Sequence, residues 1–429
     1  MTVCTSDEEA GQRQLLRGLF DAALGAARIE GKLAGFLPPP PIGRTVVIGG
    51  GKAAAAMAAE LDRVWSAPLK GAVVTSRGSA IPGYSGRIEV LEASHPVPDE
   101  SSVAAGEHMR ALVRGLGEDD LILALISGGA SSLMVGLPDG VSLADKQAVT
   151  KALLASGVPI REINMVRQQL STVKGGELAR LAGSARVVTL AVSDIPGDAI
   201  ESIGSGPTIV NAGKRVDALG ILARYGIMPA PAIERHLASA GKAVPRAVAA
   251  GRLQDSAFVI IRPADSLAAA ASVAKVSGYL PMILGDDLEG EARELGAAHA
   301  RLALQLQRKG KPVCLISGGE TTVTVRGKGR GGRNGEYVLG ALLELGGQPG
   351  IAVVAADTDG IDGSEANAGA MGFPSSIARA AALRLDAAHS LTENDSYGFF
   401  ASLGDLLLTG PTYTNVNDFR AILIEPLRA

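Results

Sequence analysis

This sequence has few cysteines, and it has neither long apolar runs nor a start that resembles a secretory leader. Only two of its 429 residues are cysteines, Cys4 and Cys314, and they lie far apart. A disulfide framework and a thiolate metal site are therefore unsupported. No stretch reaches the ~18 consecutive apolar residues that cross a membrane. The polar, acidic start MTVCTSDEEAGQRQ has no basic end followed by an apolar run. We expect a reduced, soluble, cytoplasmic chain.

Strong net charge and aromatic side chains are also scarce. The formal net charge is −3 and the pI is about 6.0, so nothing attracts nucleic acid or an anionic membrane over long range. Small molecules are the expected partners, and a homodimer is compatible with the sequence. Aromatic residues make up 3% against 47% apolar residues. The core must therefore consist of Ala, Val, Leu and Ile, which is typical of buried parallel strands under covering helices.

Several catalytic motifs are missing too. The chain has no G-x-S-x-G elbow and no H-E-x-x-H, and its five histidines show no ligand spacing, which excludes the common serine hydrolases and zinc enzymes. A P-loop fails because Lys52 is followed by Ala where Ser or Thr would reach magnesium. His95, in the strand-end segment SHPVPDES, is the one histidine that we regard as a functional candidate.

Short apolar runs alternate with amphipathic helical stretches along most of the chain. The first helix, over about 10–30, ends at the four prolines of FLPPPPIG. Strands such as TVVIGG, GAVVTS, LILALIS and VVTLAV are separated by helical stretches, as in crossover units of a parallel sheet. Residues 207–254 are rich in Pro and Ala without a strong strand. The sequence thus predicts an α/β protein with two domains, 1–250 and 251–429, the second including a hairpin-like element.

The run VVIGGGKAAAAM closes one predicted strand and opens a helix. Glycines at 49–51 allow close backbone approach, the helix start offers N–H groups to an anion, and Lys52 adds a positive charge. The same run matches G-x-G-x-x-A, which leaves a dinucleotide site open. The next strand ends without an acidic residue for an NAD ribose, although Arg77 could serve an NADP phosphate. Tight strand–helix packing is the third alternative.

The pentapeptide LISGG occurs twice, over 125–129 and over 315–319. Each copy ends an apolar strand, and the first continues into the hydroxyl-rich Ala-Ser-Ser whereas the second continues into Glu320 and TTVTV. A simple turn explains one copy alone about as well as a binding loop does. We interpret both copies as loops that present Ser-Gly-Gly amides, the first to a small anion and the second to a nucleotide.

Acidic residues follow two further strands. Asp194 lies in VSDIPGD, where an Asp can orient magnesium or accept a hydroxyl proton, or merely cap a turn. Asp357, Asp359 and Asp362 lie in ADTDGIDG, whose spacing lacks the other ligands of a calcium loop. Magnesium or ribose contact and a plain Asp-Gly turn cluster both remain open here.

A basic, glycine-rich run, RGKGRGGRNGE, ends at a strong amphipathic helix that begins near Arg333. Alone it is typical of disordered RNA-binding segments. Between a strand and a helix in an acidic chain, it favours polyphosphate binding instead.

Taken together, the blocks GGGKAAAAMA, SHPVPDE, LISGGASSL, INMVRQQLSTVKGGELA, VSDIPGD, SGPT, LISGGETTV, GGRNGE, ADTDGIDG and TNVNDF resemble the glycerate 2-kinase family. The similarity covers almost the whole chain in the family's order. It implies a Rossmann-like N-terminal domain and a smaller α/β MOFRL domain facing each other across a cleft. It also implies ATP-dependent phosphorylation of D-glycerate at the 2-hydroxyl, giving 2-phosphoglycerate, with Mg²⁺.

The resemblance also implies roles for single residues. Its conserved lysine and arginine fall on Lys52 and Arg333, one cation from each domain, and Asp194 is our candidate base. Substrate or phosphate would contact Gly50, Gly51, Ser127, Gly128, Gly129 and Ser131. The nucleotide would contact Ser317, Gly318, Gly319, Glu320, Asp357 and Asn415. Asp194 and Asp359 are the candidate magnesium ligands. The alternatives are an NADP-dependent hydroxypyruvate reductase and a non-catalytic protein that binds nucleotides or sugar acids.

Overall fold

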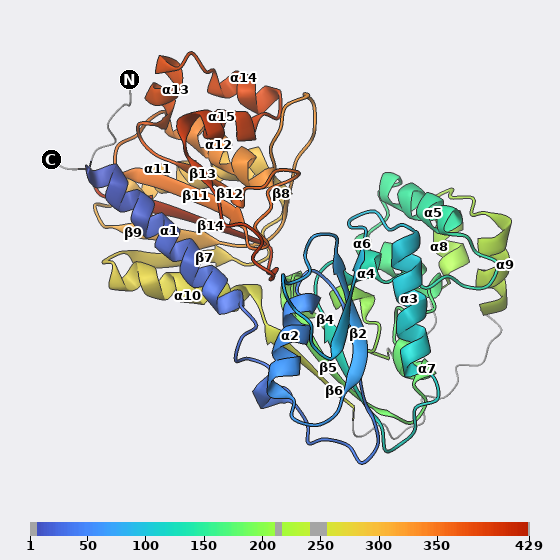
Figure 1. Ribbon diagram of the computed structural model, residues 1–429. Coiled ribbons are helices and arrows are strands. Elements are labelled where there is room, and N and C mark those ends of the chain that lie inside the picture. The colour runs from blue at the N-terminus through green and yellow to red at the C-terminus, as the bar shows by residue number, and fades with distance from the viewer. Residues whose placement is uncertain (1–6, 211–216, 241–254, 428–429) are drawn as a thin grey trace. The chain divides into compact units, whose positions relative to one another are not determined.

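The computed structural model describes residues 7–210, 217–240 and 255–427. The chain divides into two compact units (Figure 1). The N-terminal unit comprises Ile29–Ser193 and Asp198–Ile260, and the C-terminal unit comprises Met1–Arg28, Asp194–Gly197 and Ile261–Ala429. The predicted boundary near residue 250 lies outside the described residues. Each unit is described by itself below.

The N-terminal unit contains a six-stranded sheet in the order β3-β2-β1-β4-β5-β6. All the pairs from β3 to β5 are parallel, as the crossover pattern predicts, and this is the strand order of a Rossmann fold. The strands are β1 Thr45–Gly50, β2 Lys70–Ser76, β3 Ile88–Ala93, β4 Leu121–Ile126, β5 Arg186–Val192 and β6 Ser256–Ile261. β1 and β4 are buried at every position, so their apolar runs form the centre of the sheet.

Helices cover this sheet and form a second cluster beside it. The helices are η1 Ala34–Phe36, α2 Ala54–Val64, α3 Glu100–Val113, α4 Ala130–Leu133, α5 Leu143–Ala155, α6 Ile160–Gln169, α7 Glu177–Leu181, η3 Ile203–Ser205, α8 Ala218–Arg224 and α9 Pro231–Ala240. α2 and α3 pack on the strands. α5, α6, α8 and α9 share a separate apolar core that includes Leu153, Val166 and Ile233.

The C-terminal unit contains a mixed sheet in the order β13-β12-β11-β14-β9-β7. Among the described residues of this sheet, β7 and β9 pair in parallel and the other neighbours pair antiparallel. The strands are β7 Leu280–Gly285, β9 Val313–Ser317, β11 Ile351–Asp357, β12 Gly369–Gly372, β13 Leu406–Leu407 and β14 Asp418–Ile424. The helices are α1 Asp7–Ala27, α10 Pro263–Val276, α11 Ala292–Gln307, α12 Arg333–Leu345, α13 Ser376–Ala382, α14 Ala387–Thr392 and α15 Ser396–Leu403. The short helix η2 spans Pro196–Asp198.

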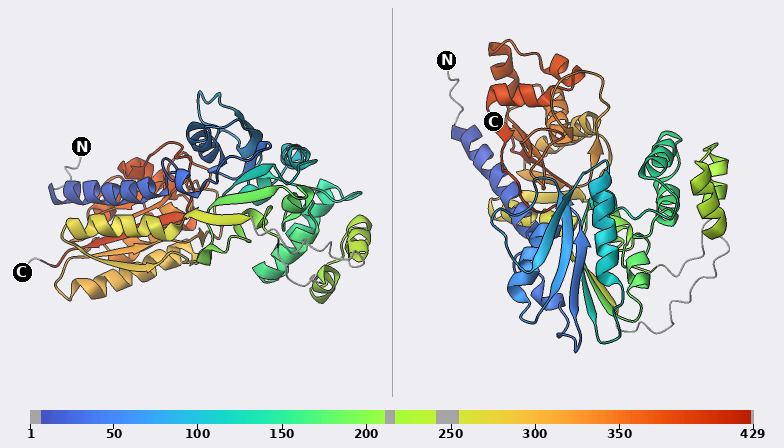
Figure 2. Two further views of the ribbon diagram at one scale, coloured as in Figure 1. Left: turned by 90° about the horizontal axis from the view of Figure 1, so that it is seen from below. Right: turned by 45° about the vertical axis from the view of Figure 1, so that its right-hand side comes forward.

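Two faces of this sheet carry different helices. Cys314 and Ile316 pack with Leu16, Leu19 and Phe20 of α1 and with α10, whereas Val313 and Leu315 pack with α11 and α12. The alternation along β9 is the period of two that a strand imposes. Figure 2 (left) shows α1 and α10 side by side. The first helix of the chain therefore belongs to the C-terminal unit, although the sequence division placed it with the first domain, because its apolar stripe is buried on this sheet.

The stretch after the second LISGG differs from the prediction. Thr321–Thr322 forms β10, which pairs in parallel with β8, Gly290–Glu291. It does not turn back onto β9, so it is not a hairpin. The strands that are consecutive in sequence and pair antiparallel are β11 with β12 and β12 with β13 instead.

Candidate functional site

Two loops of the N-terminal unit lie where its strand order reverses. β1 and β4 are neighbours at the centre of the sheet, although β2 and β3 separate them in sequence. In open α/β sheets, ligands bind outside the carboxyl ends of the strands at this switch point. The loops that leave these two ends are the glycine run after β1 and the first LISGG after β4.

The two loops are packed directly against each other. Gly51 has φ 131°, in the region that favours glycine, and a Cβ there would collide with Ser127. The Ser127 N–H donates to the Gly50 carbonyl (3.0 Å), and the Lys52 N–H donates to the Gly128 carbonyl (2.8 Å). Glycine is thus required at position 51 by the neighbouring loop, a loop–loop contact that differs from the strand–helix packing considered from the sequence.

The main-chain N–H groups of this turn are all used within the protein. Those of Gly51, Lys52 and Ala54 donate to main-chain carbonyls, and that of Ala53 donates to the buried Ser127 hydroxyl (3.0 Å). This corrects the expectation of N–H groups available to an anion or a pyrophosphate at this turn. The Lys52 side chain is the cationic group of this turn.

Arg77, the residue that could have served an NADP phosphate, already has a protein partner. Arg77 forms an ion pair with Asp99 (2.7 Å). The Asp99 carboxylate also accepts from the Ser94 hydroxyl and caps α3. A 2′-phosphate would have to displace this carboxylate.

The first LISGG keeps two N–H groups available. Within residues 7–210, neither the Gly128 N–H nor the Gly129 N–H donates to another protein group. A Cβ on Gly129, whose φ is 83°, would lie 3.0 Å from the His95 ring and 3.5 Å from Cγ of Lys52. The structure therefore brings Gly129, His95 and Lys52 together, as expected for one site.

Ser131, two residues further, lies in a basic cluster. Nζ of Lys174 donates to the Ser131 carbonyl (2.6 Å) and hydroxyl (2.5 Å), and the Arg167 guanidinium donates to the same hydroxyl (3.2 Å). The hydroxyl of Ser205 is 2.9 Å from that of Ser131. Three polar groups from separate segments thus converge on the Ser131 side chain.

Burial lowers the pKa values of the cationic side chains in this cluster. Burial, followed by the charges of Arg167 and Lys146, holds the pKa of Lys174 well below its ordinary value. Burial and Arg167 lower the pKa of Lys146 to about 7, and burial alone lowers the pKa of Arg167. Lys146 donates to the carbonyls of Gly136 and Leu170, so it fastens the loop after α6.

Sequence reasoning missed Arg167 and Lys174. Both lie in the block INMVRQQLSTVKGGELA, which supported the family resemblance but was given no chemical role. The available signal was that no acidic residue lies between Glu162 and Glu177. A partly apolar segment with two cations and no acid indicates an external anion.

The second LISGG has a different environment. Ser317 ends β9, the Gly318 N–H donates to the Gly285 carbonyl (2.8 Å), and Arg420 donates to the Gly318 carbonyl (2.8 Å). Gly319 has φ 106°, and a Cβ there would collide with the main chain of Leu288. The second LISGG loop is therefore held by contacts within the C-terminal unit. One of its two glycine N–H groups, that of Gly318, is already bonded.

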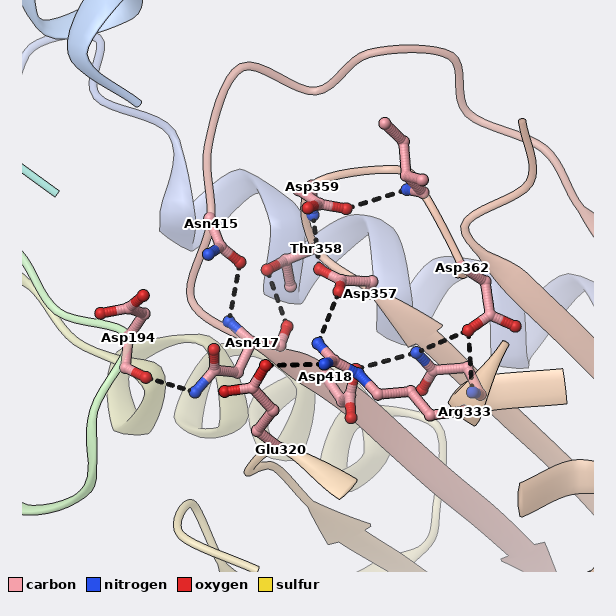
Figure 3. A network of polar contacts seen from close by, with 12 residues as sticks. Asp194, Glu320, Arg333, Asp357, Thr358, Asp359, Asp362, Asn415, Asn417 and Asp418 are labelled. Carbon is pink, nitrogen blue, oxygen red and sulfur yellow. Dashed lines mark hydrogen bonds and ion pairs between the residues drawn. The ribbon is translucent and has the colours of Figure 1, made fainter. Parts of the chain in front are cut away.

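Arg333 lies at the first position of α12 among three carboxylates (Figure 3). Its guanidinium donates to Asp418 (2.8 Å), Asp357 (2.7 Å) and Glu320 (2.7 Å). Burial opposes the charge of Arg333, but the three carboxylates outweigh it and raise its pKa. The side chain of Asp418 is 0% exposed and that of Glu320 is 58% exposed. Glu320 is thus the partner that an incoming anion can displace.

The remaining predicted residues surround this arginine. Asp359 donates its N–H to the Asp357 carboxylate (3.0 Å) and accepts from the Ile361 N–H (2.9 Å). Asn415 accepts from the Asn417 N–H, and Asn417 donates to the Asp194 carbonyl (2.5 Å) (Figure 3). Asp194 therefore reaches the network through its main chain.

Asp362 anchors the start of α12. Its carboxylate accepts from the N–H groups of Asn334 (2.9 Å) and Gly335 (2.8 Å), which suits a negative charge at a helix start. Burial raises the pKa of this carboxyl to about 7. The Asp362 of ADTDGIDG is therefore a structural cap.

The acidic groups do not form a protein-built metal cage. Among the described residues, no group of three or more His, Cys, Asp or Glu side chains could hold a metal ion. The same part of the chain contains no helix that is long and apolar enough to cross a membrane.

A Rossmann-like unit with a parallel sheet and a second unit with a mixed sheet define a two-domain α/β protein. Residues 15–238 match the family model described as "Domain of unknown function (DUF4147)", and residues 313–418 match that of the MOFRL family.

Similar proteins specify the family. The chain is 40% identical over 354 residues to the D-glycerate 2-kinase of Thermotoga maritima, covering 81% of this chain and 83% of that protein. The crystal structure of glycerate kinase from the same organism matches with a TM-score of 0.86 and 36% identity, over 97% of this chain and 100% of that one. An Agrobacterium vitis protein named "Putative hydroxypyruvate reductase" is 49% identical, over 97% of this chain and 95% of that protein. The chain belongs to the glycerate kinase family.

Proposed function

We propose that the protein transfers the γ-phosphoryl group of ATP to the 2-hydroxyl of D-glycerate, giving 2-phosphoglycerate and ADP. The observation that carries this proposal is the 40% identity to a D-glycerate 2-kinase across 83% of its length. The 2-position and the nucleotide follow from that relative's name and its family.

The arrangement of charge in the N-terminal unit supports an anionic substrate. Phosphoryl transfer depends mostly on positioning and on neutralising the charge of the transferred group. Lys52 and the N–H groups of Gly128 and Gly129 offer positive potential at the switch point, and His95 lies beside them. We assign these groups, with Gly50, Gly51, Ser127 and Ser131 as their support, to the substrate and the transferred phosphoryl group.

The C-terminal unit supplies the nucleotide side in this proposal. Arg333 exchanges Glu320 for a phosphate, while Asp357 and Asp418 keep its position. Ser317, Gly318, Gly319 and Asn415 line the same region, and Asp194 is the proposed base for the 2-hydroxyl. The proposal requires residues of both units to act on the same pair of substrates during turnover.

Magnesium fits this site only as part of its complex with ATP. The described residues offer no cluster of three ligands, whereas Mg²⁺ in kinases is commonly held by one or two carboxylates together with the phosphates. Asp194 and Asp359 are the proposed carboxylates. When bound, the ion would neutralise phosphate charge.

A coupled ADP-release assay over small hydroxy acids, with phosphorus NMR of the product, tests the proposal. We expect turnover with D-glycerate and the 2-phosphate signal. A 3-phosphate product would contradict the 2-position, and binding of glycerate and ATP without ADP release would show a non-catalytic binding protein.

An NADPH-dependent hydroxypyruvate reductase is the second candidate, because a relative 49% identical to this chain has that name. Against it, the N–H groups of the glycine run and Arg77 already have protein partners. Absorbance at the NADPH band with hydroxypyruvate separates the two: steady absorbance supports the kinase, and a stoichiometric decrease supports the reductase.

A further inference from the structure

The basic cluster around Ser131 has no internal counter-charge. Lys146, Arg167 and Lys174 influence one another's pKa values, yet none of them forms an ion pair with a carboxylate in the described part of the chain. Every other partner of these cations is a carbonyl or a hydroxyl. Buried charges without a counter-ion are costly, so such clusters are stabilised by a bound anion.

Arg167 is the member of the cluster that can reach a ligand. It lies in the last turn of α6 and is partly buried, whereas Lys174 is 3% exposed. A guanidinium has five N–H donors, and Arg167 uses one hydrogen bond, to Ser131. Its remaining donors are not among the buried groups without partners, so they face an accessible space.

The walls of the cluster are fixed in advance. Gly175 and Gly176 donate their N–H groups to the carbonyls of Ser205 (2.9 Å) and Gly206 (2.8 Å). This pairs the loop that carries Lys174 with the turn that carries Ser205. The Ser171 hydroxyl accepts from the N–H groups of Val173 and Lys174 and braces the same loop.

Ser205 is held in a strained conformation. Its φ is 65°, between Gly204 (φ 58°) and Gly206 (φ 56°). This region of φ is unfavourable for a residue other than glycine, and such a conformation persists where the surroundings over-determine it, often at binding sites. The strain places the Ser205 hydroxyl 2.9 Å from that of Ser131.

We propose that Arg167 binds the carboxylate of the hydroxy-acid substrate, with the hydroxyls of Ser131 and Ser205 as further partners and Lys174 as the positioning residue behind them. The identity of the acid as D-glycerate rests on the proposed function. A guanidinium fork matches a carboxylate in a bidentate manner. The site therefore selects acids over neutral polyols and amides of the same shape.

Direct binding without nucleotide tests the proposal. Isothermal titration compares D-glycerate with its neutral amide, D-glyceramide, in the wild type and in Arg167→Gln. We expect the wild type to prefer the acid, and Arg167→Gln to bind the acid at least ~10-fold more weakly, as the loss of a charge-assisted bond implies. The amide should bind both proteins equally. Equal affinity of both proteins for D-glycerate would overturn the proposal, as would absence of binding to the wild type.

Matched variants control for folding and for net charge. Arg301→Gln removes an exposed arginine on α11 that pairs with Glu344 and should leave the affinity for D-glycerate unchanged. Arg167→Lys keeps the charge without the fork and should lie between the wild type and Arg167→Gln. If Arg167→Gln does not fold, Arg167→Lys still tests the proposal. Unchanged affinity of Arg167→Lys for D-glycerate would overturn the proposal that the guanidinium fork of Arg167 binds the carboxylate.

Kinetics separate this proposal from the proposed function. In a wild type that turns over D-glycerate, Lys174→Met should raise KM for D-glycerate and leave KM for ATP unchanged. Equal increases in both KM values would make Lys174 merely structural. A wild type that binds D-glycerate through Arg167 but releases no ADP would contradict the kinase and leave the carboxylate site in place.

Discussion

The two copies of LISGG share five residues, a strand end and a left-handed second glycine, but they lie in opposite electrostatic surroundings. Around the first, the charged groups are Lys52, Arg167 and Lys174, and the N–H groups of both glycines remain available. Around the second, three carboxylates surround Arg333, and the first glycine N–H is bonded.

This difference shows that the pentapeptide determines the turn while distant residues determine its chemistry. Lys174 reaches Ser131 across 43 positions, and Asp418 reaches Arg333 across 85. The first region is arranged to receive an anion. The second is arranged to hold one arginine firmly, with an exposed glutamate as its exchangeable partner.

Arg333→Ala should have the largest effect. It removes a preorganised charge, so kcat should fall at least ~10²-fold. It also leaves the buried Asp357 and Asp418 without their partner, which should lower the free energy of unfolding by ~3–5 kcal/mol. Steady-state kinetics and urea unfolding measure both. Arg301→Ala, which breaks the exposed pair with Glu344, should change stability by no more than ~1 kcal/mol, and equal stability of the two variants would refute the role of Arg333 as a scaffold.

Lys52→Ala should lower kcat by a similar factor, at least ~10²-fold, with the fold intact. The physical reason is that Lys52 lies beside the N–H groups of Gly128 and Gly129 in the first LISGG. In the proposed function, no second lysine replaces its positive charge there. Lys70→Ala, at the exposed start of β2, is the control and should keep normal turnover. Near-normal kcat in Lys52→Ala would remove this lysine from the mechanism.

Alanine at the second glycine of each copy compares the two loops directly. Gly319→Ala meets the Leu288 main chain, which cannot yield, and should cost about 2–4 kcal/mol of stability. Gly129→Ala meets the His95 ring at 3.0 Å and should cost about 1–2 kcal/mol. Gly129→Ala should nonetheless reduce kcat/KM for D-glycerate about 10-fold or more, by displacing the ring beside Lys52. The reverse order of stabilities would show that the loops are supported differently from this account.

Glu320→Gln should have a smaller effect. It removes the exposed carboxylate from Arg333, so ATP meets less competition and its KM should fall about 3-fold, with stability changed by less than ~1 kcal/mol. Initial-rate measurements over ATP concentration give the value. An increase in KM for ATP would mean that Glu320 itself supports the nucleotide.

Proton uptake on binding is the smallest expected effect. The lowered pKa values of Lys174 and Lys146, about 7 for Lys146, leave part of the cluster neutral at pH 8. A bound carboxylate favours the charged lysines and raises their pKa values, so D-glycerate should take up a fraction of a proton, about 0.1–1 per site. Titration calorimetry in buffers of different ionisation enthalpy measures this uptake, which Lys174→Met should reduce. Proton release would contradict the assignment.

Much of the fold follows from local pattern. The buried strands β1, β4 and β9, the helix α12 and the parallel order of the first sheet were predictable because apolar period, glycine turns and crossover chirality act locally. The placement of α1 was not, because an amphipathic stripe does not specify which sheet it covers. The parallel pairing of Thr321–Thr322 with β8 depends likewise on a partner 31 residues away.

The candidate site was predictable in part. Its strand-end loops and Lys52, Ser131 and Arg333 could be named from motif and resemblance, because glycine-, serine- and cation-rich loops stand out in a sequence, and their roles stay predictions. The use of the N–H groups after β1, the carboxylates around Arg333 and the convergence of Arg167 and Lys174 on Ser131 all depend on contacts between distant segments, which one sequence does not encode visibly.

A crystal structure of the protein with D-glycerate and a non-hydrolysable ATP analogue tests the central claim most directly. The account predicts glycerate at the first LISGG region, its carboxylate bonded to Arg167 and Ser131, and phosphate near Arg333. Glycerate bound among the carboxylates around Arg333, or a first LISGG loop remote from every ligand, would contradict it.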